Sequence, residues 1–456
     1  MAQEKEEIRM VSVSGILGYG FPEASLAVAL AHKPHMIGVD GGSSDPGPHY
    51  LGSGKTLNSR MAMKRDLALL VRGAVASGIP MMVGTCGGAG GEPHLQECAD
   101  IVREIAREHD LHFKMALIHS EQDKTFLKER LRAGKVTAIG KAPDLTDEVI
   151  DRAARIVGMM GPEPHRAALE AGAQVILAGR GTDPSPWVAL AMHHGMPAAP
   201  SWYAGKMLEC ACNAALPKKH DCLLVTVGED FVQAEPMNPE LRCTPLSVAV
   251  QALHENASPV IRYEPGGIAD STDCKIEALS DRVVRISGMK WIPKPYTIKL
   301  EAAEKVGYSA ITFGGVRDPG FIGQLDVVMA SVREASATKI SALGIAPDRY
   351  QIVLRLYGKD GVMGEWEPAK DALSHEIGIL VEVIADSQEI ANAALALVRV
   401  TLLHTDFAGR MCKEGNMAFP FSPSDIERGA IYQFSMQHTV QIDDPLQMFP
   451  IDYETL

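Results

Sequence analysis

Arg180 and Asp183 stand in the glycine-rich segment Gly-Arg-Gly-Thr-Asp at residues 179–183, and these residue types suit acid–base chemistry on an anionic molecule. A guanidinium group holds a carboxylate through two parallel hydrogen bonds, and a carboxylate close by can move a proton or bind a metal. The alternative is a local ion pair that only holds the turn. Glu209 lies in an otherwise apolar helical stretch, where burial would raise the pKa of its carboxyl group. We predict Asp183 and Glu209 as catalytic residues and Arg180 as a substrate-binding residue, with an ion pair between Glu209 and Lys206 or Arg180 as the alternative.

A second segment with candidate ligands, residues 40–45, places two carboxylates and two hydroxyls among glycines. Exposed turns use the same residue types, but this segment is long, follows a predicted strand and is closely followed by Lys55. We therefore predict substrate binding by Asp40, Ser43, Ser44 and Asp45. A divalent metal bound by Asp40, Asp45 or Asp183 is possible, but no ligand spacing in the sequence requires one.

Cys86 lies in a third glycine-rich segment, residues 84–91, which is followed by His94. A thiolate at a helix N-terminus has a lowered pKa and can act as a nucleophile, although a lone cysteine is more often a buried structural residue. A histidine titrates near neutral pH, so His94 and His119 are acid–base candidates. We predict Cys86 and His94 as catalytic residues and Thr85, Gly87 and Gly88 as substrate-binding residues.

Short apolar runs that alternate with longer helical patterns must position these segments. Strands are predicted at residues 8–15, 36–40, 81–85, 113–118, 175–178 and 222–227, and helices at 57–77, 93–109, 147–157 and 186–194. This alternation is typical of βαβ units, and the segments after parallel strands share the carboxyl edge of the sheet, where ligands bind. We predict a Rossmann-like, mostly parallel α/β domain at residues 1–245, with helices on both faces and the glycine-rich segments converging on one cleft.

The sequence changes character near residue 246. Closely spaced apolar runs and two helices, at 323–337 and 387–403, predict a largely antiparallel α+β domain over residues 246–456. Four prolines after Met417 predict an extended C-terminal arm that packs on the body or on a neighbour. Because the apolar residues of this arm would otherwise cover little, we expect a homo-oligomer.

Composition and charge exclude several classes of function. The net charge of −13 and the lack of a basic run argue against a nucleic-acid partner. The charged N-terminal residues do not resemble a targeting segment and no apolar run approaches the length of a membrane span, so we expect a cytoplasmic protein without a membrane partner. The glycine spacing at residues 15–20 inverts the usual dinucleotide-binding pattern, so we expect no nucleotide redox cofactor.

The sequence resembles the acyclic terpene utilisation family over most of its length. The residues that carry this resemblance are SVSGILGYGFPE at 12–23, GRGTD at 179–183, GKMLEC at 205–210, VRISG at 284–288 and Pro293-x-Pro-x-Thr-x-Lys299. The resemblance implies an enzyme of acid or acyl-CoA catabolism, for which lyase activity is suggested. It also implies a domain with a ferredoxin-like fold, at the C-terminus or as a small companion protein. Because the chain lacks room for such a domain after Leu403, a separate companion protein would have to supply it.

These observations favour a lyase, most plausibly a hydratase or dehydratase, that acts on a small branched hydroxy acid or its CoA thioester. Such chemistry needs an acid and a base with separated pKa values, which Glu209 or Asp183 and a histidine could supply. The alternatives are an isomerase or racemase that uses Cys86 as one of two bases, and an acyl-CoA-binding subunit of a two-component enzyme.

Overall fold

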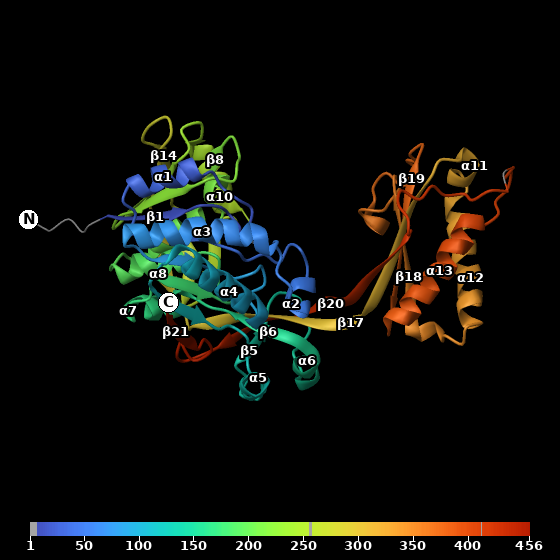
Figure 1. Ribbon diagram of the computed structural model, residues 1–456, viewed down its shortest axis with the longest axis horizontal. Helices are drawn as coiled ribbons and strands as arrows, with labels where there is room; N and C mark the ends of the chain where they lie inside the picture. Colours follow the sequence, from blue (N-terminus) through green and yellow to red (C-terminus); the bar gives the residue numbers. More distant parts are fainter. Residues whose placement is uncertain (1–6, 255–257, 412) are drawn as a thin grey trace, which may run out of the picture. The chain divides into compact units, whose positions relative to one another are not determined.

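The computed structural model describes residues 7–254, 258–411 and 413–456. The chain forms two compact units (Figure 1). Unit 1 comprises Met1–Glu304 and Phe434–Leu456, and unit 2 comprises Lys305–Gln433. The domain boundary that the sequence predicts between residues 245 and 246 stays a prediction.

Five parallel strands form the centre of the large sheet of unit 1. Their order is β1 (Ile8–Ser12), β2 (Met36–Val39), β3 (Met81–Val83), β7 (Val175–Ala178) and β4 (Lys114–Ile118). Nearly all of their residues are buried, as expected for short apolar strands covered on both faces. The predicted parallel core is confirmed for these strands. The order does not reverse at β1, so it does not reproduce the crossover point of dinucleotide-binding folds, and the Rossmann-like detail is not confirmed.

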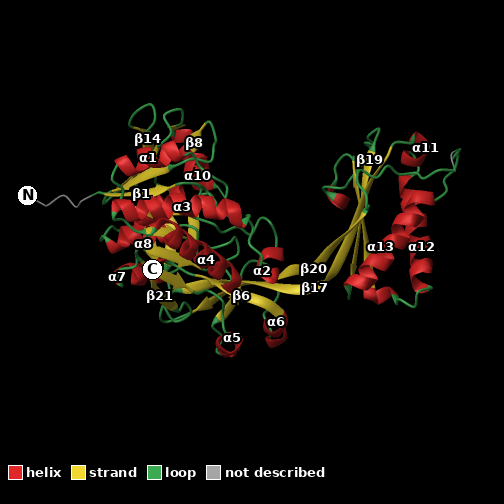
Figure 2. Cartoon of the chain, viewed as in Figure 1, coloured by secondary structure: helices red, strands yellow, loops and turns green. Residues whose placement is uncertain are grey.

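Helices cover both faces of this parallel core (Figure 2). One face packs on α1 (Glu23–Ala31), α3 (Arg60–Ser77) and α4 (Glu92–His109), and the other on α7 (Pro162–Glu170), α8 (Ser185–His193) and α9 (Ala198–Leu208). Helix α3 begins where the Ser59 side chain accepts a hydrogen bond from the Ala62 amide, and it ends at Gly78 in the left-handed conformation. The predicted helices at 57–77, 93–109 and 186–194 correspond to α3, α4 and α8.

Antiparallel strands extend the parallel core at both edges. Beside β1 lie β9 (Leu223–Val227), β10 (Phe231–Pro236), β15 (Val284–Ser287) and β14 (Lys275–Ala278), and beside β4 lies β21 (Ile451–Thr455). The expectation that residues 222–227 join the parallel set is therefore wrong. No helix separates β9 from β10, and these two strands form a hairpin, which requires antiparallel pairing.

The predicted helix at 147–157 is a helix only in its first half. Helix α6 (Asp147–Arg152) ends directly at β6 (Ala153–Met159), which pairs with β17 (Thr297–Val316). The β-branched residues Ile156 and Val157 favour this extended conformation. Strand β17 is long, and it is one of the closely spaced strands expected after residue 246.

Unit 2 contains a four-stranded antiparallel sheet with two helices. After β17 the chain forms α12 (Leu325–Ser341), β18 (Tyr350–Tyr357), β19 (Ile377–Ala385), α13 (Gln388–His404) and β20 (Asp425–Gln441), and the strand order is β18-β19-β17-β20. Helices α12 and α13 lie side by side and share a core with the sheet (Figure 1). This βαββαβ succession and strand order are the ferredoxin-like arrangement. The argument that the chain lacks room for such a fold after Leu403 is therefore wrong, because its elements begin at β17.

The remaining elements are short. They are α2 (His49–Ser53), α5 (Lys124–Arg132), α10 (Pro245–Leu253), α11 (Pro319–Ile322), β5 (Val136–Ala138), β8 (Ala215–Leu216), β11 (Arg242–Cys243), β12 (Ile261–Glu264), β13 (Gly267–Asp270) and β16 (Lys290–Pro293), with three 3₁₀ turns at Ala211–Ala214, Pro347–Arg349 and Gly364–Trp366. None of the helices that the structure describes has both the length and the apolar composition to cross a membrane.

The residues after Met417 form β20 and β21, and β21 pairs with β4 of unit 1. Met448 and Phe449 are buried in the core of unit 1, whereas Phe421 and Phe434 are 42% and 46% exposed. Part of the apolar surface that suggested self-association is thus covered within the chain, and the homo-oligomer stays a prediction.

Candidate functional site

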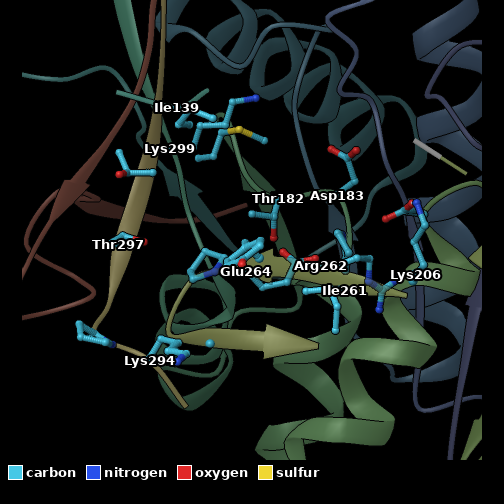
Figure 3. A pocket seen from close by; sticks show the side chains of 18 of the residues that line it. Ile139, Thr182, Asp183, Lys206, Ile261, Arg262, Glu264, Lys294, Thr297 and Lys299 are labelled. Carbon is cyan, nitrogen blue, oxygen red and sulfur yellow. The ribbon is translucent and has the colours of Figure 1, made fainter. Parts of the chain in front are cut away.

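A cavity of about 640 Å³ opens beside the segment that follows β7 (Figure 3). Its polar wall contains Asp183 from this segment, Lys206 and Glu209 from the end of α9, and Arg262 and Glu264 from β12. Lys294, Thr297 and Lys299, at and before the start of β17, complete the wall together with residues of β20. All of these residues belong to unit 1. The volume lies within the usual range for sites that bind small molecules.

Arg180 lies behind this wall and is almost fully buried. Its Nε donates to Glu301 Oε2 at 3.0 Å, and its Nη1 lies 3.4 Å from Asp183 Oδ1 and 3.5 Å from Thr85 Oγ1. Lys299 Nζ donates to the second oxygen of Glu301 at 3.1 Å. Burial opposes ionisation of Glu301, but Arg180 and Lys299 outweigh it and lower the pKa of Glu301 to about 2. In this arrangement Arg180 holds Asp183 in place and does not line the cavity.

Asp183 and Glu209 line the same cavity in different electrostatic environments. Asp183 is one-third exposed, and its Oδ1 atom lies 3.4 Å from Nη1 of the Arg180 guanidinium. Glu209 follows the last turn of α9, is buried, and accepts a hydrogen bond from Lys206 three residues earlier. Burial raises the pKa of Glu209, the charge of Asp183 adds to this rise, and Lys206 offsets part of it. The predicted contact between Glu209 and Lys206 is present, with Lys206 Nζ donating to Glu209 Oε1, and it lies at the cavity.

A third acid, Glu264, faces the cavity from β12. Burial raises the pKa of Glu264 to about 7, and the charges of Arg262 and Lys206 oppose this rise. In Figure 3, Arg262 lies between Glu264 and Lys206, on the side of the cavity that carries Asp183. The polar end of the cavity therefore combines three acids with two cations.

Apolar side chains line other parts of the cavity. Ile139 and Met159 belong to its lining, and Figure 3 shows Ile139 beside Lys299, away from Asp183 and Lys206. Ile261, Tyr263 and three prolines, Pro184, Pro265 and Pro295, supply further apolar surface. The cavity can thus accommodate a molecule with one polar end and a hydrocarbon chain.

The glycine-rich segments do share one edge of the sheet, as predicted, but they pack against one another instead of enclosing an open cleft. The Leu17 amide donates to the Asp40 carbonyl at 2.7 Å, and the Ser43 amide donates to the Gly88 carbonyl at 3.0 Å. A Cβ atom on Gly90 would lie 2.3 Å from the Arg180 amide nitrogen. The glycines therefore permit close backbone contact, and no space is left for an anion between Gly90 and Arg180.

Asp40 and Thr85 are buried behind Arg180. Thr85 Oγ1 accepts from the Gly181 amide at 3.3 Å, so it supports the segment that carries Asp183. Burial raises the pKa of Asp40 well above its ordinary value, and the charge of Asp183 adds to this rise. Neither residue lines the cavity.

The other predicted substrate-binding residues lie elsewhere. Ser44 and Asp45 are exposed, and the Asp45 amide donates to Ser43 Oγ at 3.2 Å in a turn of the ordinary kind. Gly87 and Gly88 adopt positive φ angles of 65° and 97° where their backbone packs on His94 and Leu57. These residues shape the turns and are not part of the cavity wall.

His94 and Cys86 occupy buried positions away from the cavity. The Nε2 atom of His94 lies 3.1 Å from the Tyr50 carbonyl oxygen and 3.0 Å from that of Lys55, and burial lowers the pKa of His94. Burial raises the pKa of Cys86 well above its ordinary value, which is the opposite of the lowered pKa expected for an activated thiolate. His94 therefore anchors the segment around α2, and the environment of Cys86 is that of a structural thiol.

Within the described ranges, no group of three or more histidine, cysteine, aspartate or glutamate side chains is arranged to hold a metal ion. Asp45 is exposed on its turn, whereas Asp40 is buried behind Arg180, so the predicted metal ligands do not gather at one point.

The analysis of the sequence missed Glu301, Arg262 and Glu264. Lys299 and Thr297 were recognised only as marks of the family motif Pro293-x-Pro-x-Thr-x-Lys299, without a role. Arg262 and Glu264 alternate along a short strand, a pattern that is equally common on exposed surfaces. Only the family motif at residues 293–299 could have drawn attention to the residues on this side of the cavity.

Comparison with known proteins gives one family. The model of the acyclic terpene utilisation family protein AtuA matches residues 81–217 and 227–422. The matched residues include Asp183, Lys206, Glu209, Arg262 and Glu264 of the cavity wall. No curated protein and no solved structure matches the chain.

Proposed function

The chain belongs to the acyclic terpene utilisation family, and on this premise we propose that it is a hydratase or dehydratase acting on a branched acyclic hydroxy acid or its CoA thioester. Membership of the family implies a part in the catabolism of acyclic terpenes. The observation that carries the proposal is the pair Asp183 and Glu209, two carboxyl groups in contrasting environments at one cavity.

Removal of water from a hydroxy acid needs a group that donates a proton and a group that accepts one. A buried carboxyl group with a raised pKa holds its proton near neutral pH and suits the first role, whereas a carboxylate beside a guanidinium suits the second. Glu209 has the first environment and Asp183 the second. No histidine is among the described residues that line the cavity, so the acid–base pair consists of two carboxyl groups instead of a carboxyl group and a histidine.

The reaction then proceeds with balanced proton transfers. Glu209 donates a proton to the departing hydroxyl group as the C–O bond breaks, and Asp183 removes a proton from the neighbouring carbon as the C=C bond forms. The protonated hydroxyl group leaves as water. Asp183 then releases the proton that it has taken to solvent, and Lys206, in contact with Glu209, passes a proton to that carboxyl group and takes one from solvent in return. Hydration follows the same steps in reverse.

The shape of the cavity supports a branched, acyclic substrate. Ile139 and Met159 offer apolar surface to a hydrocarbon chain, and Figure 3 shows Ile139 apart from Asp183. The isomerase alternative used Cys86 as a base, and Cys86 is buried away from this cavity. No observation favours the binding-subunit alternative over an enzyme.

The test is a hydration assay on a branched 2-enoic acid and on its CoA thioester, followed by the loss of absorbance of the conjugated double bond. We expect Asp183→Asn and Glu209→Gln each to lower kcat by about 10²- to 10⁴-fold while the protein stays folded, because general acid–base catalysis contributes rate enhancements of this size. Asp45→Asn, on an exposed turn, is the matched control and should retain activity. Absence of turnover with both substrates, or full activity of both variants, would refute the proposed function.

A further inference from the structure

Among the described residues, two cations of the cavity wall, Arg262 and Lys294, make no side-chain hydrogen bond or ion pair with an acid, although Glu264 and Glu209 lie close enough to Arg262 for its charge to lower their pKa values. In the part of the chain that the structure describes, no side-chain hydrogen bond or ion pair joins either of them to another residue. The other two cations are committed, since Lys206 contacts Glu209 and Lys299 contacts Glu301. In a chain with a net charge of −13, acids are in excess, so two uncommitted cations at one cavity indicate an anionic ligand.

Arg262 is the better placed of the two for the reacting end of a substrate. Its charge acts on Glu209, Glu264 and Lys206, and it faces the end of the cavity where Asp183 lies (Figure 3). Lys294 lies apart from Asp183 and Lys206 in the same view. A ligand group on Arg262 would therefore place the adjoining carbon atoms near the proposed acid and base.

The chemistry of a guanidinium group distinguishes the two substrate classes left open above. A free carboxylate matches the planar fork of arginine with two charge-assisted hydrogen bonds. A thioester offers one neutral carbonyl oxygen, which accepts fewer and weaker hydrogen bonds from the guanidinium group of Arg262 than a carboxylate does. Arg180 does not take this role, because it is buried beside Glu301 and Asp183 and does not line the cavity.

We propose that the cavity takes a free branched carboxylic acid, with the carboxylate on Arg262 and the hydrocarbon chain directed towards Ile139. This inference rests on the proposed function for its choice of cavity, and it narrows the substrate from an acid or a thioester to the acid. It also assigns the substrate anchor to Arg262 instead of Arg180.

Binding measurements test the inference without relying on turnover. The probes are 3,7-dimethyloctanoate, the corresponding amide and the corresponding N-acetylcysteamine thioester, titrated calorimetrically into the full-length protein at pH 7. We expect the wild type to bind the acid at least about tenfold more tightly than the amide or the thioester, because hydrogen bonds to charged groups contribute that much. Arg262→Gln should weaken binding of the acid roughly 10- to 100-fold and leave binding of the amide unchanged.

Two further variants keep the test decisive. Arg262→Lys keeps the positive charge but cannot make the two parallel hydrogen bonds of a guanidinium group. Its affinity for the acid should therefore lie between that of the wild type and that of Arg262→Gln. Arg166→Gln, on the surface of α7 and paired with Glu170, is the matched control and should bind all probes like the wild type. Circular dichroism and thermal melting establish that each variant is folded.

The inference is overturned if the thioester binds as tightly as the acid, if the acid does not bind, or if Arg262→Gln weakens the acid and the amide equally. Its failure is separable from that of the proposed function. Turnover of a CoA thioester without binding of the acid refutes the inference, but it supports the proposed lyase function. Binding of the acid that depends on Arg262, without turnover of any substrate, supports the inference and refutes the lyase.

Discussion

Replacing Glu301 by glutamine should destabilise unit 1 strongly at neutral pH and little at low pH. Glu301 is 9% exposed and is held by Arg180 and Lys299. Its pKa falls from an ordinary value of 4.5 to about 2, a difference of about 2.5. At about 1.4 kcal/mol for each tenfold change in proton affinity, the ionised form contributes about 3.5 kcal/mol to the free energy of unfolding. This agrees with the roughly 3–5 kcal/mol that is lost when one partner of a buried ion pair is removed.

The direction of the pH dependence follows from the lowered pKa. A carboxyl group whose pKa is lowered in the folded state contributes stability that is present above its unfolded pKa and is lost as the pH falls through its folded pKa. The difference in the free energy of unfolding between wild type and Glu301→Gln should therefore have its largest value above pH 4.5. It should decrease as the pH approaches about 2.

Urea denaturation, followed by tryptophan fluorescence, measures this difference. Trp187 and Trp202 are buried in unit 1 and report its unfolding. Glu170→Gln removes an exposed carboxylate paired with Arg166 at 3.3 Å and should change stability little, which makes it the control. A loss below about 1 kcal/mol at pH 7, or a loss that is the same at pH 3, would refute the assignment of Glu301 as the counterion of Arg180.

Two further predictions concern other parts of unit 1. His119 lies 2.8 Å from Glu92 and 3.0 Å from Asp452 of β21, and these carboxylates outweigh burial and raise its pKa. His119→Gln should therefore lower Tm by about 2 °C at pH 6, and the difference should vanish as the pH rises through the raised pKa; an undiminished difference at pH 9 would contradict this. Gly90→Ala should lower Tm much more than Gly134→Ala, because both glycines have a φ of 67° but only at Gly90 would the added Cβ strike the backbone of Arg180. Equal melting temperatures of the two variants would show that close packing at Gly90 is unimportant.

The parallel core of unit 1 could be predicted because its signals are local. The strands β1, β2, β3, β4 and β7 are short apolar runs separated by helical patterns, and burial on both faces makes such runs easy to recognise. Glu209 could be predicted for the same reason, since a carboxyl group in an apolar helix is conspicuous in the sequence. Its partner Lys206 lies only three residues earlier in the same helical stretch, so this contact could also be predicted.

The rest of the cavity depends on contacts between distant residues. Arg180 and Glu301 are 121 positions apart, and β6 meets β17 only in the folded chain. The segment at 147–157 was predicted as one helix because its first residues are helical, and nothing local shows that Ala153 begins a strand. Tertiary pairing overrides local preference there.

Glycine-rich segments have two physical uses, and this limits what they indicate about site residues. Glycines allow a ligand to approach the backbone, but they equally allow one backbone segment to approach another. A Cβ on Gly42 would lie 2.5 Å from Arg180 Nη1, and a Cβ on Gly87 would lie 2.7 Å from His94 Cβ. The two uses cannot be distinguished without the neighbours, so His94 and Cys86 were taken as catalytic candidates beside glycines that serve packing.

The path of the chain through β17 and β20 has a consequence for the history of this protein. The chain leaves unit 1 at Glu304 within β17 and returns at Phe434 within β20, and these strands are neighbours in one sheet. Unit 2 is therefore an insertion whose two ends lie on adjacent strands, the arrangement in which a whole domain is most easily accepted between two residues of a host. A single genetic event could therefore add or remove the whole of unit 2. Every residue of the cavity wall would remain, because all of them lie before or after the residues of unit 2.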